Sequence, residues 1–418
     1  MKTIKTKKQR LVNGKALIVT VDISKDRHFG YWRCPDGTDV KSFPFPNNGA
    51  GFSEFWERIS RAKEIHRLDE IVFGYESTGS YGEALVHFMK ARGVRLVQVN
   101  PMHTKRVKEL QGNSPNKTDQ KDPKIIADII ELGRVLTVVI PEGSAAELRR
   151  LTQARERSTE RHTVLMNQLQ TLLAIIFPEF LQVLKNVRTA TAQYLLKHYP
   201  TPQSLVAYGL DNLTRTMRKV SCGKLREDRA RALYEAAETS VGVVEGQASI
   251  LLETQAILAA MEASEKFTEG LEKEMSHHLK QIPYSSCLLS IKGIGEVTAA
   301  GLIGEVGDFR KYSTLGEIMK LAGLDLYEVS SGKHQGTRRI SKRGRPLMRK
   351  LLYFAALNMV RQGCIMEHQY QRYLDRGMLK TKALIAIARK LLGIIFAIVR
   401  DNTVYDYSRA SYQLKEAA

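Results

Sequence analysis

Cysteine is scarce in this chain, and its four copies lie far apart. Cys34, Cys222, Cys287 and Cys364 form no Cys-x-x-Cys pair. Such spacing indicates neither a zinc site nor a disulfide framework. We therefore expect a protein of a reducing cytosol.

Long apolar segments are also missing. The longest apolar run, Leu391 to Val399, is much shorter than the ~20 residues that a bilayer span requires. The N-terminus, Met1 to Arg10, is basic, but the apolar stretch after it lacks a cleavage signature and leads directly into Asp22. We expect neither a membrane anchor nor a signal peptide.

Acidic residues are outnumbered by basic ones. The 418 residues include 64 Lys or Arg and 44 Asp or Glu, which gives a formal net charge of +20. The hydrophobic share of 43% and the charged share of 26% are ordinary for a folded protein, and the length suffices for two or three domains. So large a positive excess favours a polyanionic partner, above all nucleic acid.

The first third of the chain alternates short apolar, β-branched segments with helical patterns. The apolar segments predict strands at 17–22, 28–33, 40–45, 70–75 and 95–99. Pro35-Asp36-Gly37 is a turn between the second and third strands, because Pro presets φ and Gly accepts positive φ. Helices are expected at about 51–65, after the fourth strand, and after the fifth up to about Gly112. The order β-β-β-α-β-α-β-α is that of the ribonuclease H-like fold.

Four carboxylates stand where such a fold can bring them together. Asp22 and Glu76 each close an apolar run, while Asp119 and Asp122 lie three residues apart just before a helix. Carboxylate oxygens bind hard divalent cations, and two such cations can hold a phosphodiester during an in-line displacement. The set predicts a metal site that acts on nucleic acid, although each residue alone would equally fit a turn or a helix cap.

The position of Asp122 has a second interpretation. Pro123 follows it, and a residue before proline avoids helical backbone. Asp122 is therefore also a candidate for the cap of the next helix, with Pro123 at the first helical position. Asp128, further along that helix, is the reserve candidate for the fourth carboxylate.

The middle of the chain is expected to be helical. Leucines recur at helical spacing from about 143 to 177, where Pro178 ends the pattern. A second long helix at about 244–279 is expected to pair with it antiparallel. The pair is either a packed hairpin within one chain or an oligomerising coiled coil. Residues 180–245 between the two carry no motif and are expected to be helical.

The C-terminal part, from about residue 283, holds two features suited to nucleic acid. Gly293 and Gly295 match the turn of a helix-hairpin-helix, in which backbone N–H groups at a helix start hold a phosphate. A Gly-rich turn between packed helices would give the same pattern. From Ser331 to Lys350 there are eight Lys or Arg and no Asp or Glu, which indicates either a phosphate clamp or a solvated basic loop. The candidate phosphate ligands are Lys333, Arg338, Arg339, Lys342, Arg343, Arg345 and Arg349. Amphipathic helices are expected at 347–359 and 379–399.

Taken together, these motifs resemble the IS110 family of insertion-sequence transposases, also called DEDD transposases. Asp22, Glu76, Asp119 and Asp122 match the four carboxylates, with Lys117-Thr118 before the second pair. The C-terminal match consists of Gly293-x-Gly295 with Thr298, Ala322-Gly323-Leu324, Ser330-Ser331-Gly332, and Ile340-Ser341-Lys342-Arg343-Gly344 with Arg349. The resemblance covers roughly residues 16–180 and 285–400.

The resemblance implies three domains and a reaction. The domains are a RuvC-like catalytic domain at 1–140, a helical coiled-coil region at 141–282 with a divergent insertion at about 181–245, and a C-terminal transposase domain at 283–418. The reaction is the excision and insertion of the element itself, through attack of Ser331 on DNA to form a phosphoserine intermediate. The implied cofactor is Mg²⁺, as a two-metal site at the four carboxylates.

The same resemblance implies partners. They are donor and target DNA, a structured noncoding bridge RNA as guide, and further copies of the chain in a dimer or tetramer, in the nucleoid-associated cytoplasm of a prokaryote. On residues alone Ser331 is unremarkable, since a serine needs a base or a metal ion to become a nucleophile. His334 is the nearest candidate base, and the choice of Ser331 over Ser330 depends on the family analogy.

Three other functions remain open on the residues. A RuvC-like junction nuclease that hydrolyses with metal-bound water needs the carboxylates but not Ser331. A non-enzymatic nucleic-acid-binding protein needs neither. An actin-like ATPase also begins with an Asp on its first strand, but the sequence shows no later Gly-rich phosphate loop of the expected kind, and its charge argues against that fold.

Overall fold

The computed structural model describes residues 14–76, 79–111, 122–328, 336 and 338–407, in two compact units, 1–139 and 140–418. The elements of the first unit are β1 (Ala16–Asp22), β2 (Arg27–Arg33), β3 (Phe43–Pro46), α1 (Gly49–Ile65), β4 (Glu70–Glu76), α2 (Glu83–Ala91), β5 (Arg95–Val99), α3 (Pro101–Gln111), α4 (Asp122–Glu131) and β6 (Leu136–Thr137). The five predicted strands and the order of strands and helices up to α3 are confirmed. The third strand begins at Phe43 rather than at residue 40, because Asp39 forms only an isolated bridge with Arg33.

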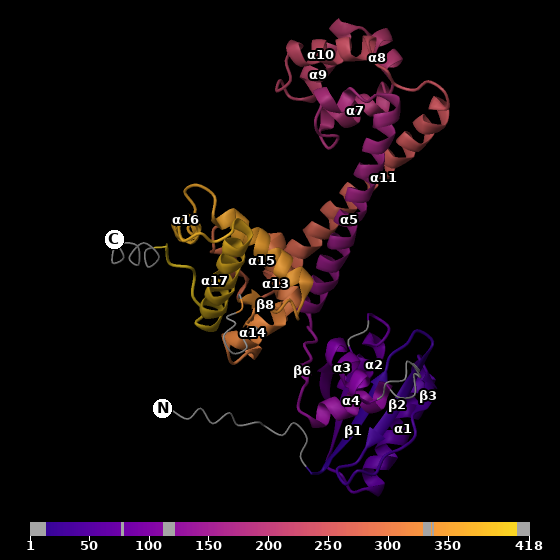
Figure 1. Ribbon diagram of the computed structural model, residues 1–418, viewed down its shortest axis with the longest axis vertical. Coiled ribbons are helices and arrows are strands. Elements are labelled where there is room, and N and C mark those ends of the chain that lie inside the picture. Colours follow the sequence, from indigo (N-terminus) through magenta and orange to yellow (C-terminus); the bar gives the residue numbers. More distant parts are fainter. Residues whose placement is uncertain (1–13, 77–78, 112–121, 329–335, 337, 408–418) are drawn as a thin grey trace. The chain divides into compact units, whose positions relative to one another are not determined.

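The strands of this unit form one mixed sheet in the order β3-β2-β1-β4-β5-β6 (Figure 1). β1, β4 and β5 are parallel to one another, whereas β2, β3 and β6 each run antiparallel to their neighbours. Parallel strands put their carboxyl ends at the same edge, so the ends of β1 and β4 lie side by side. This arrangement is consistent with a ribonuclease H-like domain.

The two faces of the sheet have different covers. α4 packs on one face, where Ile125, Ile126 and Ile130 share a core with Ile18 and Val72 of the strands. α1 packs on the other face, where the ring of Phe55 contacts those of Phe45 and Phe73. Since strand side chains alternate between faces, residues an even number of positions from Ile18 or Val72 point toward α4.

The second unit is almost entirely helical. Its long helices are α5 (Ser144–Ile176), α11 (Gln247–Lys280) and α17 (Lys380–Arg400). The shorter elements are α6 (Phe180–Val183), α7 (Ala190–His198), α8 (Pro202–Tyr208), α9 (Leu210–Val220), α10 (Glu227–Glu238), α12 (Ser285–Leu289), α13 (Glu296–Val306), a 3-10 turn (Phe309–Lys311), α14 (Leu315–Ala322), β7 (Leu326–Tyr327), β8 (Arg339–Ile340), α15 (Pro346–Met359) and α16 (Glu367–Asp375). Within the described ranges, no helix is long and apolar enough to cross a membrane.

α5 and α11 form the predicted antiparallel pair (Figure 1). Arg155 Nε donates to Glu272 Oε1 at 2.7 Å, and further along the pair Ser158 Oγ lies 3.0 Å from Ser264 Oγ. The pair joins two separate cores. At one end it packs with α12–α17, and at the other with α6–α10. The helices predicted at 347–359 and 379–399 are confirmed as α15 and α17.

Candidate active site and nucleic-acid interface

Asp22 and Glu76 end two neighbouring parallel strands. Val21 of β1 pairs with Tyr75 of β4, so the two carboxylates follow in the same register. Asp22 lies four residues after Ile18 and Glu76 four after Val72, which places both on the face that α4 covers. Both side chains are half-buried, and solvent reaches them. The structure thus brings these two predicted site residues together at one edge of the sheet.

The N-terminus of α4 is fastened to the same edge. Thr20, two residues before Asp22 on the same face, donates through Oγ1 to the carbonyl oxygen of Pro123 at 2.6 Å, and this bond is buried. α4 begins at Asp122, whose carboxylate accepts a bond from Lys108 Nζ of α3 at 2.6 Å. A negative charge in the first turn also suits the helix dipole. The first turn of α4, which contains Asp122, is therefore hydrogen-bonded to β1 two residues before Asp22.

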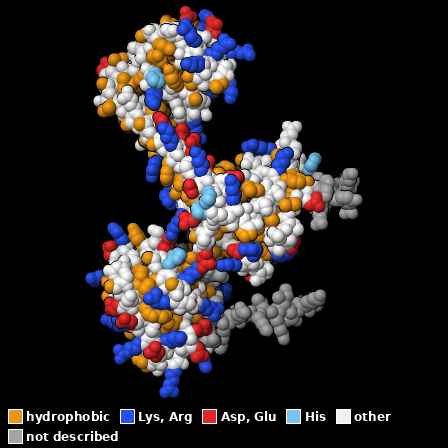
Figure 2. Space-filling view, turned by 180° about the vertical axis from the view of Figure 1, so that it is seen from behind, with side chains coloured by type: hydrophobic (Ala, Val, Ile, Leu, Met, Phe, Trp, Pro, Cys, Tyr) orange, Lys and Arg blue, Asp and Glu red, His pale blue; other side chains and the backbone are white. Residues whose placement is uncertain are grey.

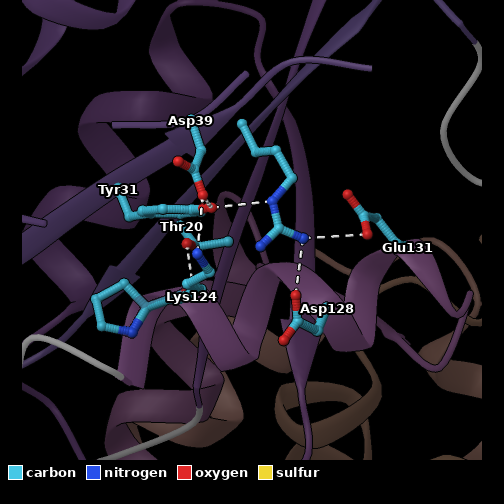
Figure 3. A network of polar contacts seen from close by, with 8 residues as sticks. Thr20, Tyr31, Asp39, Lys124, Asp128 and Glu131 are labelled. Atoms are coloured by element: carbon cyan, nitrogen blue, oxygen red, sulfur yellow. Dashed lines mark hydrogen bonds and ion pairs between the residues drawn. The ribbon is translucent and has the colours of Figure 1, made fainter. Parts of the chain in front are cut away.

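A polar network holds the rest of α4 against β2 (Figure 3). The guanidinium of Arg33 donates to Asp128 at 2.7 Å, to Glu131 at 3.1 Å and to the hydroxyl of Tyr31 at 2.9 Å. Burial alone would lower the pKa of Arg33, but the hydrogen bonds with Asp128 and Tyr31 raise it above its usual value. Asp128, the reserve candidate for the fourth carboxylate, is thus occupied in fixing the helix.

Asp39 extends this network to the turn after β2. Its Oδ2 accepts from the Tyr31 hydroxyl at 2.7 Å and from Lys124 Nζ at 3.0 Å (Figure 3). These two bonds hold the pKa of Asp39 below its usual value. Sequence reasoning did not find Arg33, Tyr31 or Asp39. Only Thr20 could have been inferred from the sequence, because it lies two residues before Asp22 on the same strand and so points to the same face.

The donor set at this edge suits a hard divalent cation. Asp22, Glu76 and Asp122 offer carboxylate oxygens, the ligands that Mg²⁺ prefers. Asp119, the fourth member, lies outside the described residues. Among those that are described, no three His, Cys, Asp or Glu side chains come close enough to hold a metal ion. The described carboxylates therefore fit Mg²⁺ by chemistry and by shared edge, without forming a closed ligand cluster.

The predicted nucleophile, Ser331, lies outside the described residues, as do Ser330, Lys333 and His334. The strands on either side are described. β7 and β8 pair antiparallel, with Leu326 opposite Ile340 and Tyr327 opposite Arg339. Along the sequence, the segment that carries Ser331 therefore lies between two strands that pair with each other.

The basic residues after Ser331 fall into two groups. Arg339, Lys342 and Arg343 are exposed, and Arg338, also exposed, donates to Glu328 at 2.8 Å. The other group has partners inside the fold. Arg349 donates to the carbonyl oxygen of Ala322 at 2.9 Å, and burial lowers its pKa.

Arg345 belongs to the second group. Its guanidinium donates to the backbone carbonyl of Glu305, a residue that is only 4% exposed. The bonds of Arg345 and Arg349 hold the segment after β8 against α13 and α14. Their predicted contacts with nucleic acid stay a prediction, as do those of the exposed group.

Gly293 and Gly295 form a tight turn between α12 and α13. Gly293 has φ +109°, and a Cβ there would lie 2.9 Å from the side chain of Met359. Gly295 is the N-cap of α13. The hydroxyl of Tyr407 accepts from the backbone N–H of Lys292 at 2.7 Å and donates to the carbonyl of Ser290 at 2.9 Å. Two helices and a glycine turn are therefore present, and phosphate binding by this turn stays a prediction.

Comparison with known proteins gives two family matches. A family model of the IS110 DEDD type, described as a transposase, matches residues 19–178. A second, described as a transposase of the IS116/IS110/IS902 family, matches residues 285–371. The first match contains Asp22, Glu76, Asp119 and Asp122, and the second contains Ser331.

Similar proteins match most of the chain. The 43.6 kDa protein of insertion element IS110 from Streptomyces coelicolor is 22% identical over 92% of this chain and 94% of its own. The 44.8 kDa protein of insertion element IS116 from Streptomyces clavuligerus is 25% identical over 93% and 95%. The transposase for insertion sequence element IS1111A from Coxiella burnetii is 22% identical over 84% of each chain.

Proposed function

The chain belongs to the IS110/IS116 family of transposases, and from this premise we propose that it excises and inserts its own insertion sequence. One observation carries the proposal. Asp22 and Glu76 end adjacent parallel strands, and the first turn of α4, which contains Asp122, is hydrogen-bonded to β1 two residues before Asp22. Carboxylates so arranged can act on a phosphodiester.

We infer that the carboxylates act with Mg²⁺. Asp22, Glu76 and Asp122, together with Asp119, would hold the ion, which when bound stabilises negative charge on the phosphate oxygens. The chain's own residues keep these ligands in place. Thr20 fixes the N-terminus of α4 and Arg33 its body, while Lys108 orients Asp122 and offsets part of the negative charge that gathers there.

We propose Ser331 as the nucleophile. Its Oγ attacks phosphorus and loses its proton, a Ser–O–P bond forms, and the P–O bond to the neighbouring nucleotide breaks to leave a sugar hydroxyl. Reversal of these steps with a different DNA end rejoins the strand. The position of Ser331 between β7 and β8, within the second family match, supports this role.

The finer assignments belong to the same proposal. The N-terminal sheet would be a RuvC-like domain, α5 and α11 a coiled-coil region, and the turn at Gly293–Gly295 a helix-hairpin-helix. Family likeness supports a bridge RNA that reads sequence by base pairing while the protein grips backbones through charge. It also supports action as a dimer or tetramer in the cytoplasm.

Excision in cells tests the function. Cells carry the gene with its native flanking DNA, and PCR across the joined ends detects the excised circular element. We expect a circle with the wild type and at least about 100-fold less with Asp22→Asn or Ser331→Ala, because catalytic groups that act as a unit cannot substitute for one another. Asp69→Asn, an exposed carboxylate paired with Lys15, is the matched control and should retain excision.

A labelled DNA substrate tests the chemistry. The proposed mechanism predicts a covalent protein–DNA adduct that survives denaturation and is lost in Ser331→Ala and after chelation of Mg²⁺. Cleavage without an adduct in the wild type would favour the junction nuclease, which needs no serine. An adduct that disappears in Ser330→Ala but persists in Ser331→Ala would move the nucleophile by one residue.

A further inference from the structure

Residues 180–238 form a helical module, α6–α10, that neither family match covers. Its core is well packed, with Leu195, Leu205, Leu213 and Leu233 fully buried. It is attached to the ends of α5 and α11 away from α12–α17 (Figure 1). No role in strand cleavage accounts for its outer surface, which carries exposed aromatic and basic side chains.

Four aromatic rings form a continuous row on this module. Tyr194 and His198, one turn apart on α7, have ring centroids 4.4 Å apart. His198 lies 6.3 Å from Tyr199, and Tyr199 stacks on Tyr208 at 4.0 Å with 25° between the planes. Tyr194 and His198 are exposed, and Tyr199 and Tyr208 are half-buried. Tyr199 and Tyr208 also pack against the core of the module, whereas Tyr194 and His198 present ring surface to solvent.

A basic helix face borders the row. Arg215, Arg218 and Lys219 of α9 are three and four residues apart, so they share one face, and all three are exposed. In the part of the chain that the structure describes, none of the three forms an ion pair with a carboxylate, whereas Arg231 on α10 pairs with Glu227 at 2.8 Å. Figure 2 shows Lys and Arg side chains gathered over this module, in the upper part of the view.

The row is joined to the helix that carries the basic face. The hydroxyl of Tyr208 lies 2.7 Å from Thr216 Oγ1, which joins the end of the row to α9. Hydrogen bonds with Thr216 and Tyr199, together with the charge of Arg215, lower the pKa of Tyr208. Rings and unpaired cations therefore make up one surface, formed by α7, α8 and α9.

We propose that this surface binds an unpaired DNA strand, whose bases stack on Tyr194 and His198 and whose phosphates contact Arg215, Arg218 and Lys219. Aromatic platforms beside a basic groove suit single strands, because the base faces of a duplex are already stacked. A partner protein with an apolar surface would leave the three cations without counter-charges. The choice of DNA rests on the proposed function, since cutting and rejoining a duplex exposes unpaired strands.

Binding by the full chain tests the proposal. Fluorescence anisotropy measures the Kd of a labelled oligothymidine over a series of salt concentrations. We expect Arg215→Gln/Arg218→Gln to raise the Kd about tenfold and to reduce the slope of log K against log salt by about 1.4, or about 0.7 per phosphate contact. Tyr194→Leu/His198→Leu should raise the Kd at least about fivefold with the slope unchanged, because stacking is lost but no ion contact is.

Matched controls come from other parts of the surface. Arg231→Gln/Lys266→Gln removes two exposed cations that are already ion-paired, and Phe267→Leu removes a 53% exposed ring on α11. In a second readout, oligonucleotides containing 5-iodouracil are photo-crosslinked and the joined peptides are sequenced. We expect crosslinks to Tyr194 or His198.

Three results would overturn the proposal. The surface variants could bind oligothymidine as tightly as the controls do. The affinity for duplex DNA could fall in the ring variant Tyr194→Leu/His198→Leu as much as the affinity for the single strand does. Finally, RNA of matched sequence could bind more than tenfold tighter than DNA through the same residues, which would make RNA the occupant. None of these readouts needs catalysis. Loss of excision in every sample would therefore contradict the proposed function while leaving this binding result intact.

Discussion

The guanidinium of Arg33 donates to side chains from two elements, Tyr31 on its own strand and Asp128 and Glu131 on α4. The side chain is only 11% exposed, so water cannot replace these partners. Removing one side of such an arrangement leaves buried charges without compensation, which costs more than the bonds themselves contribute. The consequence reaches the active site, since α4 carries Asp122 at its first position.

Arg33→Gln should therefore loosen α4 specifically. We expect the backbone amides of α4 to exchange with solvent about 30-fold faster, which corresponds to about 2 kcal/mol of local opening free energy. Hydrogen–deuterium exchange resolved by peptide measures this. Arg92→Gln is the control, because Arg92, at the end of α2, contacts the rings of Phe88 and Trp56 and the carbonyl of Phe88 but, among the described residues, nothing in α4. Equal exchange in α4 of both variants would mean that the network does not hold the helix.

Asp39 makes the same network depend on pH. Its pKa is lower in the folded state than in the unfolded chain, so it adds stability above the unfolded value, and that stability is lost as pH falls through the folded value. Asp39→Asn should lower the melting temperature at pH 7, and the loss of stability should be less than about 1 kcal/mol since the group is partly exposed. The difference should shrink as pH falls below the usual pKa of an aspartate, about 3.9. Melts of both proteins from acidic pH to pH 7 measure this. A gap that stays constant with pH would rule out the carboxylate as its source.

Prediction from the sequence succeeded for residues whose position on a strand or helix carries a signal. Asp22 and Glu76 were found because each ends an apolar run, and parallel pairing then made them neighbours. Asp128 shows the limit. It has the right residue type and helix, but its partner, Arg33, lies 95 residues away. A single sequence does not show that two residues so far apart are in contact.

At the scale of elements, α13 packs very closely against α5. A Cβ at Gly304 would lie 2.6 Å from the backbone nitrogen of Arg149 and 2.8 Å from its Cα. At Gly301, one turn earlier, a Cβ would lie 2.6 Å from a methyl of Leu351 and 3.2 Å from one of Thr152. Gly304 thus lets the backbones of α13 and α5 touch, and Gly301 leaves room for side chains of α5 and α15. This contact holds the start of α5 to the C-terminal core.

Gly304→Ala should force these helices apart. We expect a loss of about 2–3 kcal/mol in the stability of this unit, because the contact is with backbone, which cannot turn aside as a side chain would. Thermal and urea unfolding, followed by circular dichroism, measure the change. Gly270→Ala is the matched control, since its Cβ meets nothing within 4 Å in the middle of α11 and should be neutral or stabilising by up to about 1 kcal/mol. If the two variants melt alike, the close packing is not what stabilises the contact.

Long helices were predictable because a leucine stripe at helical spacing requires a partner. The bounds of α5 and α11 agree with the predicted ones to within a few residues. The short helices α6–α10 lack a repeated stripe, because each buries only a few side chains in a common core. Their existence was expected, but neither their arrangement nor the row of rings they form could be predicted.

At the scale of the whole molecule, the net charge of +20 should control DNA affinity. We expect the Kd for duplex DNA to rise roughly 1,000-fold between 50 and 200 mM salt if about six phosphates are neutralised. Anisotropy titrations over this range measure the slope. Asp22→Asn should change the slope little, because the role proposed for Asp22 concerns the reacting phosphate and not the cations that neutralise the bound backbone. A shallow slope in the wild type would mean that the charge serves another purpose.

The structure divides into two compact units at residue 139. The expected domain boundary at 140 is one that the family resemblance implies, and the change from alternating apolar segments to one long leucine stripe lies just after it. What the chain does with Ser331 depends on residues outside the described ranges. Family likeness, rather than local chemistry, identified that serine.

The segment between α5 and α11 begins and ends at one place. The backbone N–H of Val243 donates to the carbonyl of Ile175 at 2.9 Å, so the chain returns to within one hydrogen bond of where it left. The backbone thus closes this segment at its base, at the last turn of α5 and just before α11. A change in the side chains of the outer helices would leave the closure intact, because the bond joins main-chain atoms.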